Sequence, residues 1–265
     1  MSMRSINSAK IMFGMVSVPV KIYTAAKAET VAFHMLTPSG NRVEQKLQDA
    51  VTKEHVEYAD CDRGYEVTPD KCLRFTREEL KTLDANCEAK EIVIVEFVDE
   101  ESLDPISIEK SYYLGPDKGG AKGYSLLSEA LKCKHKVAVA QWNSRGREHL
   151  VVIRPYKNGL VLHQMFYAPE VVRFDEIDFE VKPLNDSERK AACKLLLAMS
   201  SDTFDSSTYS DGYQARVKKA VETKLGGGTI VATAPKSDKG SSSDDFAALL
   251  EKSVEALKNT SYRVG

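Results

Sequence analysis

The sequence predicts a β-rich α+β protein in which closely spaced antiparallel strands form a barrel or sandwich, followed by a helical C-terminal arm. Four runs of alternating apolar residues are separated only by short polar connections; they cover 136–142, 148–156, 159–167 and 171–181. Asn158-Gly159, between the second and third run, is a strong hairpin signal. After Pro183 the apolar residues recur at helical spacing instead.

The N-terminal half supplies further strands around a polar segment. Residues 11–23, 30–36 and 104–116 have the apolar alternation of strands, and 91–98 is rich in β-branched residues. Residues 37–70 are polar and contain scattered proline and glycine, so we expect them to be irregular.

Helices are expected where cap residues and apolar spacing coincide. Thr76 followed by Glu79 has the spacing of a capping box and predicts a helix over 74–83. Leucine and alanine share one face of a helix predicted over 123–133.

The C-terminal part reads as two helices, a tether and a last helix. The first helix, 185–200, begins at Asn185 and Glu188, and the second, 210–228, is closed by Gly226. We expect four parts with the bounds 1–183 for the β-rich body, 184–228 for a helical arm, 229–243 for a flexible linker and 244–265 for a short amphipathic helix.

Composition limits the class of protein. The chain has 265 residues, 42% of them hydrophobic, and a net charge of −2, which argues against binding to nucleic acid by bulk positive charge but leaves room for a local basic surface. Five cysteines without any C-x-x-C pair indicate reduced thiols and not a disulfide framework. Neither a signal peptide nor an apolar run of about 18 residues is present, so we expect a cytoplasmic protein without a membrane partner.

No segment carries the pattern of a catalytic or metal site. The stretch GPDKGGAKGYS, 115–125, has Ala121 where a phosphate-binding loop requires lysine, and a loop before a helix is the better interpretation. His55, Cys61 and Cys72 form the one plausible zinc cluster, and their spacing matches no known zinc motif. We expect no metal, no cofactor and no enzymatic activity.

Basic residues in the connections are the remaining candidates. Residues 13–25, FGMVSVPVKIYTA, read as a strand interrupted by Pro19 and followed by Lys21. Any single basic residue is better explained as solvated surface, but connections on a rigid β scaffold are where binding residues are usually placed. The candidates for a binding surface are Lys21, Lys27, Arg42, Lys46, Arg145 and Arg147.

Several motifs in order resemble a known family. The opening RSINSAKIMFGMVSVPVKIYTA is similar to a pattern that ends in P-V-K-[LV]-Y-x-A, and EIVIVEFV, KSYYLGPD, LVVIRPYKNGLVLHQMFYAPEV and FDSSTYSDGYQARVKKAVETKLGGG follow in the family's order. From Arg4 to about Gly228 the chain resembles prokaryotic Ku, the DNA-end-binding family of bacteria and some phages.

The resemblance implies a homodimer whose two β-barrels and strand-built bridges, about 37–75 here, form a ring. The ring threads onto a double-stranded DNA end, holds the sugar-phosphate backbone and recruits an ATP-dependent ligase for non-homologous end joining. Lys21 fits the lysine of P-V-K, Arg42 and Lys46 fit a basic run of the bridge, and Arg145 falls in a basic turn, whereas Lys27 and Arg147 are chosen from position alone. Pro19 is then expected at a strand edge or bulge, where no ladder N–H is needed.

The chain departs from the family pattern in several places. Glu44 and Leu47 replace basic residues of the bridge run, and the family's C-x-x-C-G is missing. Equal numbers of basic and acidic residues follow Gly228, so we expect no DNA binding by the tail. Such compact forms resemble phage members; the expected location is the bacterial nucleoid, or the host cytoplasm for a phage protein.

Two questions stay open at this point. The terminal helix has an apolar set that either docks the ligase or packs on its own dimer, with the linker composition favouring the ligase; the set is Phe246, Leu249, Leu250 and Leu257. The alternative function is an oligomeric scaffold that binds duplex DNA along its length and bridges molecules without end preference.

Overall fold

The computed structural model describes residues 3–28, 31–69, 71–84, 90–144, 146–180, 183, 185–230, 249–250 and 252–254. The chain divides into two units. One comprises Met1–Glu29 with His34–Glu176, and the other Thr30–Phe33 with Ile177–Gly265.

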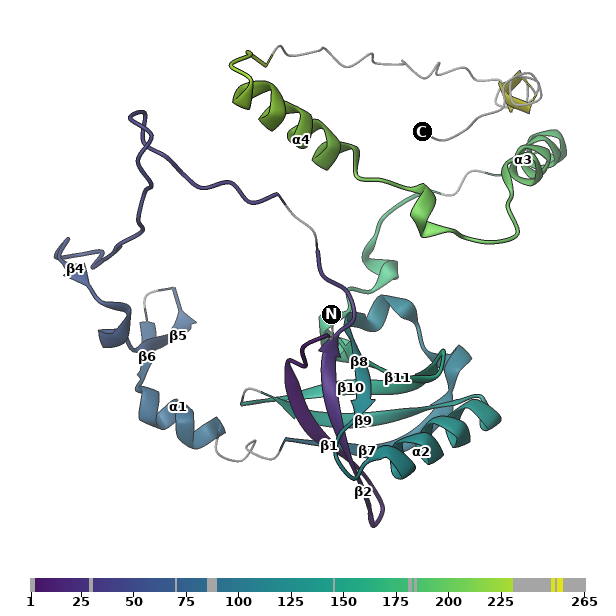
Figure 1. Ribbon diagram of the computed structural model, residues 1–265, viewed down its shortest axis with the longest axis horizontal. Helices are drawn as coiled ribbons and strands as arrows, with labels where there is room; N and C mark the ends of the chain where they lie inside the picture. The colour runs from purple at the N-terminus through teal and green to yellow at the C-terminus, as the bar shows by residue number, and fades with distance from the viewer. Residues whose placement is uncertain are drawn as a thin grey trace. The chain divides into compact units, whose positions relative to one another are not determined.

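The first unit contains a closed barrel of seven strands in the order β1-β2-β8-β11-β10-β9-β7 (Figure 1). Neighbouring strands are antiparallel except β1 and β7, which pair in parallel over three residues. The strands are β1 (Asn7–Phe13), β2 (Val16–Thr24), β7 (Glu91–Asp99), β8 (Ile108–Pro116), β9 (Lys136–Ser144), β10 (Arg147–Tyr156) and β11 (Gly159–Met165). The predicted β-barrel is confirmed.

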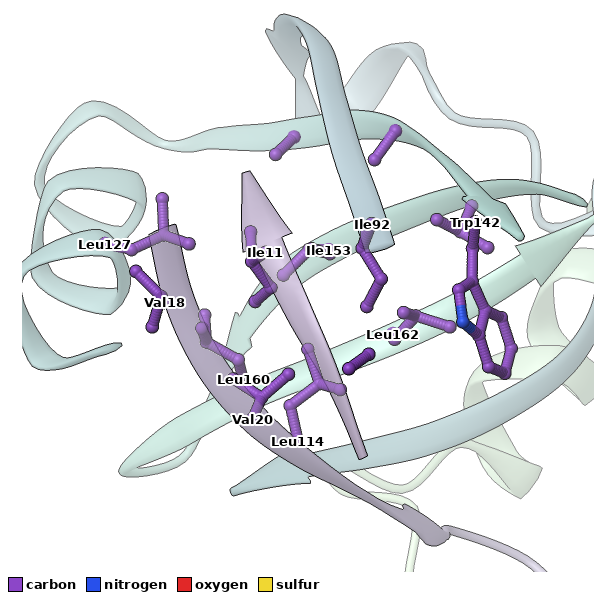
Figure 2. Close-up of a cluster of buried hydrophobic side chains, with 14 of the residues drawn as sticks. Ile11, Val18, Val20, Ile92, Leu114, Leu127, Trp142, Ile153, Leu160 and Leu162 are labelled. Carbon is purple, nitrogen blue, oxygen red and sulfur yellow. The ribbon is translucent and has the colours of Figure 1, made fainter. Parts of the chain in front are cut away.

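Alternating side chains of these strands fill the barrel interior (Figure 2). Ile11, Ile153 and Leu162 have no exposed surface, and each such aliphatic side chain contributes about 1.5–3 kcal/mol by leaving water. Helix α2 (Ala121–Lys134), the predicted helix of 123–133, adds Tyr124, Leu127 and Leu131 to the same cluster. The interior is therefore a packed core and not a ligand cavity.

The opposite face of the β9–β10–β11 sheet carries a second cluster. Val137, Val152 and Met165 are buried there. Leu103 and Ile108, the first residue of β8, pack against them, and the segment before β8 makes two 3-10 turns at Glu100–Ser102 and Pro105–Ser107. The outer surface of the barrel is thus covered on this side.

Two predicted strands differ from the structure in their bounds. Residues 11–23 are not one strand but the end of β1 and most of β2, joined by a turn in which Gly14 has a φ of 56° and Met15 is fully exposed. Apolar residues continue through this turn, so the sequence pattern does not indicate it. The strand predicted over 104–116 begins only at Ile108.

Two other predicted strands, 30–36 and 171–181, are wrong as strands of this chain. Residues 31–36 form only an isolated bridge, between Leu36 and Arg42. The described residues 171–180 form a short 3-10 turn at Phe174–Glu176. Both segments have the apolar alternation of a strand, and neither finds a strand partner among the described residues.

The long connection between β2 and β7 is less irregular than predicted. It contains the two-stranded sheets β3 (Leu47–Gln48) with β4 (His55–Val56) and β5 (Arg63–Thr68) with β6 (Lys71–Phe75), followed by α1 (Arg77–Asp84). We call residues 31–84 the excursion.

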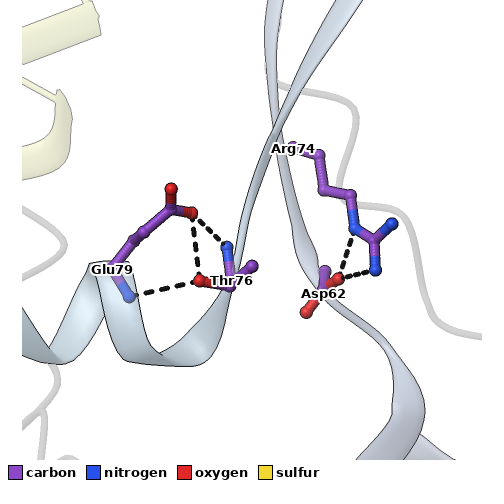
Figure 3. Close-up of polar contacts among 4 residues, drawn as sticks. All are labelled: Asp62, Arg74, Thr76 and Glu79. Carbon is purple, nitrogen blue, oxygen red and sulfur yellow. Dashed lines mark hydrogen bonds and ion pairs between the residues drawn. The ribbon is translucent and has the colours of Figure 1, made fainter.

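The excursion holds its local structure by polar contacts (Figure 3). Thr76 and Glu79 form the predicted capping box: the Thr76 N–H donates to the Glu79 carboxylate over 2.7 Å, and the Glu79 N–H donates to the Thr76 hydroxyl over 3.2 Å. The hydrogen bonds that the Thr76 N–H and the Thr76 hydroxyl donate to the Glu79 carboxylate lower the pKa of Glu79. Arg74 forms an ion pair with Asp62 beside this cap.

The second unit is mainly helical. Helix α3 (Asp186–Met199) begins with the predicted Asn185–Glu188 capping box, and α4 (Gly212–Leu225) begins at Asp211 and ends at Gly226. Ala191 is the one buried side chain among the described residues of this unit. Leu249 and Leu250 are helical and half-buried, whereas Phe246 and Leu257 lie outside the described residues.

Candidate nucleic-acid interface

The glycine-rich segment 115–125 is shaped by packing against β2. A Cβ atom at Gly120 would lie 2.2 Å from the carbonyl oxygen of Pro19, and one at Gly123 would lie 2.8 Å from the Val18 side chain. The N–H of Asp117 donates to that same Pro19 oxygen over 3.0 Å. The glycines therefore let the β8–α2 connection approach the β2 backbone.

This contact explains the proline inside a strand. Val20 and Pro116 are the last pair between β2 and β8, and Pro19 lies one residue beyond that pair. The strand neighbour on the β8 side ends here, so the N–H that proline lacks is not needed for the ladder. Pro19 accordingly stands where a ladder edge was expected.

Lys21 lies on the outer face of β2, because its neighbours Val20 and Ile22 point into the core. Its Nζ is 3.5 Å from Oδ1 of Asp117, and 40% of its side chain is exposed. The pKa of Asp117 is lowered, first by the hydrogen bond from the Lys118 N–H and then by the charge of Lys21. Lys21 is thus a partly neutralised cation at the surface.

A shallow hollow of about 420 Å³ lies beside this ion pair. Its lining is Ser8, Ala9, Lys10, Pro19, Lys90, Glu91 and Asp117. The backbone N–H of Lys10 donates to the carbonyl oxygen of Lys90 over 3.0 Å, which brings the two residues together from β1 and the start of β7. Sequence reasoning missed both lysines; the alternation of β1, which points Ala9 and Ile11 inward, places Lys10 on the outer face. The hollow therefore brings Lys10 and Lys90 together beside Glu91 and Asp117, with Lys21 nearby.

The other predicted residues lie elsewhere. Lys27, Arg42, Lys46 and Arg147 are exposed, and none has an ion pair with a described carboxylate. Arg42 closes a loop whose other end is Leu36, and Arg147 begins β10 opposite Ser144. None of the four belongs to the lining of the hollow, and Arg145 lies outside the described residues.

The remaining arginines of the described excursion serve its local structure. The Arg63 guanidinium donates to the Tyr58 hydroxyl over 2.6 Å and lies 5.6 Å from the centre of that ring. Arg77 donates to the Tyr58 carbonyl oxygen over 2.7 Å, and Arg74 is paired with Asp62. These side chains are already engaged, in contrast to Arg42 and Lys46.

One serine–histidine contact invites a catalytic interpretation. Nδ1 of His163 is 2.8 Å from the Ser111 hydroxyl, and Nε–H of Arg154 donates to Nε2 over 2.9 Å. Arginine can only donate, so the ring carries its single proton on Nδ1 and donates it to Ser111. Burial and the Arg154 charge lower the pKa of His163. This histidine has no free nitrogen with which to accept the serine proton, so the contact is structural.

Within the described ranges no group of three or more histidine, cysteine, aspartate or glutamate side chains is placed to hold a metal. Among the same residues, no helix combines the length and apolarity needed to cross a bilayer. The fold and the site together define a closed β-barrel protein whose outer face carries lysines and carboxylates around a shallow hollow.

Comparison with known proteins agrees with this class. The family model of the Ku70/Ku80 beta-barrel domain matches residues 12–193. The "Non-homologous end joining protein Ku" of Paraburkholderia phymatum is 35% identical over 233 residues, 88% of this chain and 76% of the relative. Proteins of the same name from Koribacter versatilis and Mycolicibacterium smegmatis are 34% and 32% identical, over 96% and 97% of this chain and 87% and 83% of theirs. The chain belongs to the Ku family.

Proposed function

We propose that this protein binds the ends of double-stranded DNA without sequence preference, as a homodimeric ring, and acts in non-homologous end joining in the bacterial nucleoid or the cytoplasm of a phage host. Family membership supports the class of function, and the names of its relatives support the pathway. No catalytic step is required of the chain itself.

The exposure of the described excursion residues is the observation that supports the ring. None of the described residues 31–69 and 71–83 is buried, although Tyr65, Val67 and Leu73 are apolar and 46–65% exposed. Isolated two-stranded sheets are marginally stable in water and need a further surface to pack on. A second copy of the chain, bringing the same excursion by symmetry, supplies such a surface.

Two segments with strand-like sequences fit the same arrangement. Val172, Phe174, Ile177 and Phe179 are 53–74% exposed and alternate with polar residues over most of their length. Pairing with a strand of a second copy would satisfy the backbone of such a segment and cover its exposed apolar side chains. Segments 31–36 and 171–180 are therefore proposed as dimer contacts.

Backbone contacts would hold the DNA. Lysine and arginine displace counterions from phosphates without reading bases, and a ring needs positive charge only on its inner wall, so a net charge of −2 is compatible with this role. The proposed contacts are Lys21, Lys27, Arg42, Lys46, Arg145 and Arg147, to which the hollow adds Lys10 and Lys90.

Trapping tests threading directly. Protein is bound to a linear plasmid, the plasmid is circularised with an added ligase, and the mixture is then washed at high salt. A threaded ring remains on the closed circle and is released when a restriction enzyme reopens it. Release by salt alone, before reopening, would favour the scaffold that binds duplex DNA along its length.

We propose that the C-terminal segment recruits an ATP-dependent DNA ligase through Phe246, Leu249, Leu250 and Leu257. Half-burial of Leu249 and Leu250 in the described part of that helix supports an apolar face there. A protein shortened after residue 228 is expected to bind DNA ends normally and to lose stimulation of the partner ligase. Loss of the dimer in the shortened protein would instead assign the helix to dimer packing.

A further inference from the structure

The outer surface of the barrel carries a pair of stacked tyrosines between two cations. The rings of Tyr113 on β8 and Tyr156 at the end of β10 are 6.0 Å apart and nearly parallel, at 18°. The Arg154 guanidinium carbon and the Lys157 Nζ lie 5.5 Å and 5.4 Å from the centre of the Tyr156 ring. We call these four residues the tyrosine strip.

The strip packs on a buried residue of β11 and is also held by a hydrogen bond. Val161, the register partner of both Tyr113 and Arg154, is 3% exposed in the strand between them. The Arg154 Nε is fixed by its hydrogen bond to His163, and its Nη1 lies 3.7 Å from Oε1 of the half-exposed Glu100, so Lys157 is the less engaged cation of the strip. The arrangement is therefore prepared before any ligand arrives, which reduces the entropy lost on binding.

Lys157 occupies a costly backbone conformation. It has a φ of 52° in the two-residue turn between Tyr156 and Gly159, where glycine or asparagine would be favoured. The next residue, Asn158, is better suited to that position but does not hold it. Strain of this kind is concentrated at binding sites, and here it places an ammonium group over an aromatic face.

The tyrosines remain accessible. Tyr113 is 37% and Tyr156 36% exposed, and neither hydroxyl has a hydrogen-bond partner among the described residues. A hollow of about 420 Å³ opens beside them, and its lining also includes Leu114, Lys157 and Asn158. Tyr113 is the register partner of Tyr23, which follows Lys21 by two positions on the same outer face of β2.

We propose that the tyrosine strip binds the unpaired bases of a single-stranded extension at a DNA end. Aromatic faces stack on bases of any identity, and flanking cations pair with the phosphates between them. A base inside a duplex is already stacked on its neighbours. The tyrosines therefore gain no stacking contact with intact duplex DNA, which can interact only with the two charges of the strip. The inference rests on the proposed binding of DNA ends and adds a preference for ends with an extension.

The experiment uses full-length protein and two duplexes of equal length, one blunt and one with an extension that contains 2-aminopurine. Wild-type protein is expected to bind the extended duplex more tightly and to quench the 2-aminopurine fluorescence. Tyr113→Leu and Tyr156→Leu are expected to remove the quenching and to weaken binding of the extended duplex by about tenfold, the size of one lost base–aromatic stack. Binding of the blunt duplex stays unchanged.

Three further variants make the result specific. Tyr156→Phe keeps the stack and should behave as wild type, and Lys157→Gly relieves the turn and removes only the cation. Tyr213→Ala changes an exposed tyrosine of α4 and should leave the ratio of the two affinities unchanged. Equal losses on both duplexes, or unchanged quenching in both leucine variants, would overturn the inference. Failure of the wild type to bind even the blunt duplex would instead overturn the proposed function.

Discussion

Arg154 donates a hydrogen bond from Nε to Nε2 of His163 over 2.9 Å, and this bond fixes the histidine as neutral. The pKa of His163 is lowered from its ordinary value of 6.5, mainly by burial and then by the Arg154 charge. As the pH falls below about 6.5, His163 of the unfolded chain binds a proton, whereas His163 of the folded chain stays neutral. The free energy of unfolding therefore decreases as the pH falls.

The prediction is a loss of stability between about pH 7 and about pH 5 that depends on His163. His163→Gln can still accept from Arg154 and donate to Ser111 but does not titrate, so its stability should vary less over this range. Trp142, the single tryptophan, is buried in the barrel core and reports unfolding by fluorescence. Glu109 and Asp117 have lowered pKa values and act only at lower pH. Equal pH dependence in both proteins would contradict this account.

Gly159 is required by packing and not by the turn. A Cβ atom there would lie 2.8 Å from the Tyr124 hydroxyl, which accepts the Leu160 N–H over 2.8 Å and donates to the Leu114 carbonyl over 2.7 Å. Gly159→Ala is expected to cost about 1–3 kcal/mol in chemical denaturation, because it displaces a buried hydroxyl from two hydrogen bonds.

Two variants test that explanation. Combining Gly159→Ala with Tyr124→Phe should cost less than the sum of the single changes, because the clash and the lost hydroxyl concern the same contact. Gly64→Ala, whose added atom would meet only the Cys72 Cβ at an ordinary 3.7 Å, should leave stability nearly unchanged. Strict additivity would contradict the proposed clash.

The parts of the fold that the sequence predicted well depend on local signals. The strands from 136 to 165 show their alternation directly, and the caps at Thr76 and Asn185 mark helix starts. The Asn158-Gly159 signal located the hairpin correctly, and the structure adds that Gly159 is required by its contact with Tyr124. This requirement for glycine is imposed by Tyr124, which lies 35 positions away, so the sequence around Gly159 does not reveal it.

The candidate site was harder to predict for the same reason. Lys10 and Lys90 become neighbours only through the parallel pairing of β1 with β7. Asp117 partly neutralises Lys21 from a connection that sequence alone assigns to a loop. Segments 30–36 and 171–181 have strand patterns, but their described residues form only an isolated bridge at Leu36 and a 3-10 turn at Phe174–Glu176.

Asp117→Asn should strengthen DNA binding. Asparagine keeps an oxygen for the Lys118 N–H but removes the charge that holds Lys21, so binding of a blunt duplex is expected to tighten about two- to fivefold at low salt. Fluorescence anisotropy measures the change. Asp175→Asn, which disrupts the exposed pair with Arg173, is the matched control and should have no effect. Weaker binding by the Asp117 variant would remove Lys21 from the DNA contacts.

Lys10→Gln and Lys90→Gln should each weaken duplex binding equally on all sequences. If each lysine neutralises one phosphate, the slope of the logarithm of the binding constant against that of the salt concentration falls by about 0.9 per substitution. Lys194→Gln on α3 changes an exposed lysine outside the hollow and serves as control. A slope that stays at the wild-type value would exclude the hollow from the interface.

The central claim is that binding requires a DNA end. It is tested most directly by competition at fixed salt, in which a labelled linear duplex bound by the protein is challenged with equal masses of linear and relaxed circular DNA. The account predicts that the linear competitor displaces the probe and the circle does not, because a closed ring cannot pass over an intact duplex. Equal displacement by the circle would contradict threading and make lengthwise binding the better description.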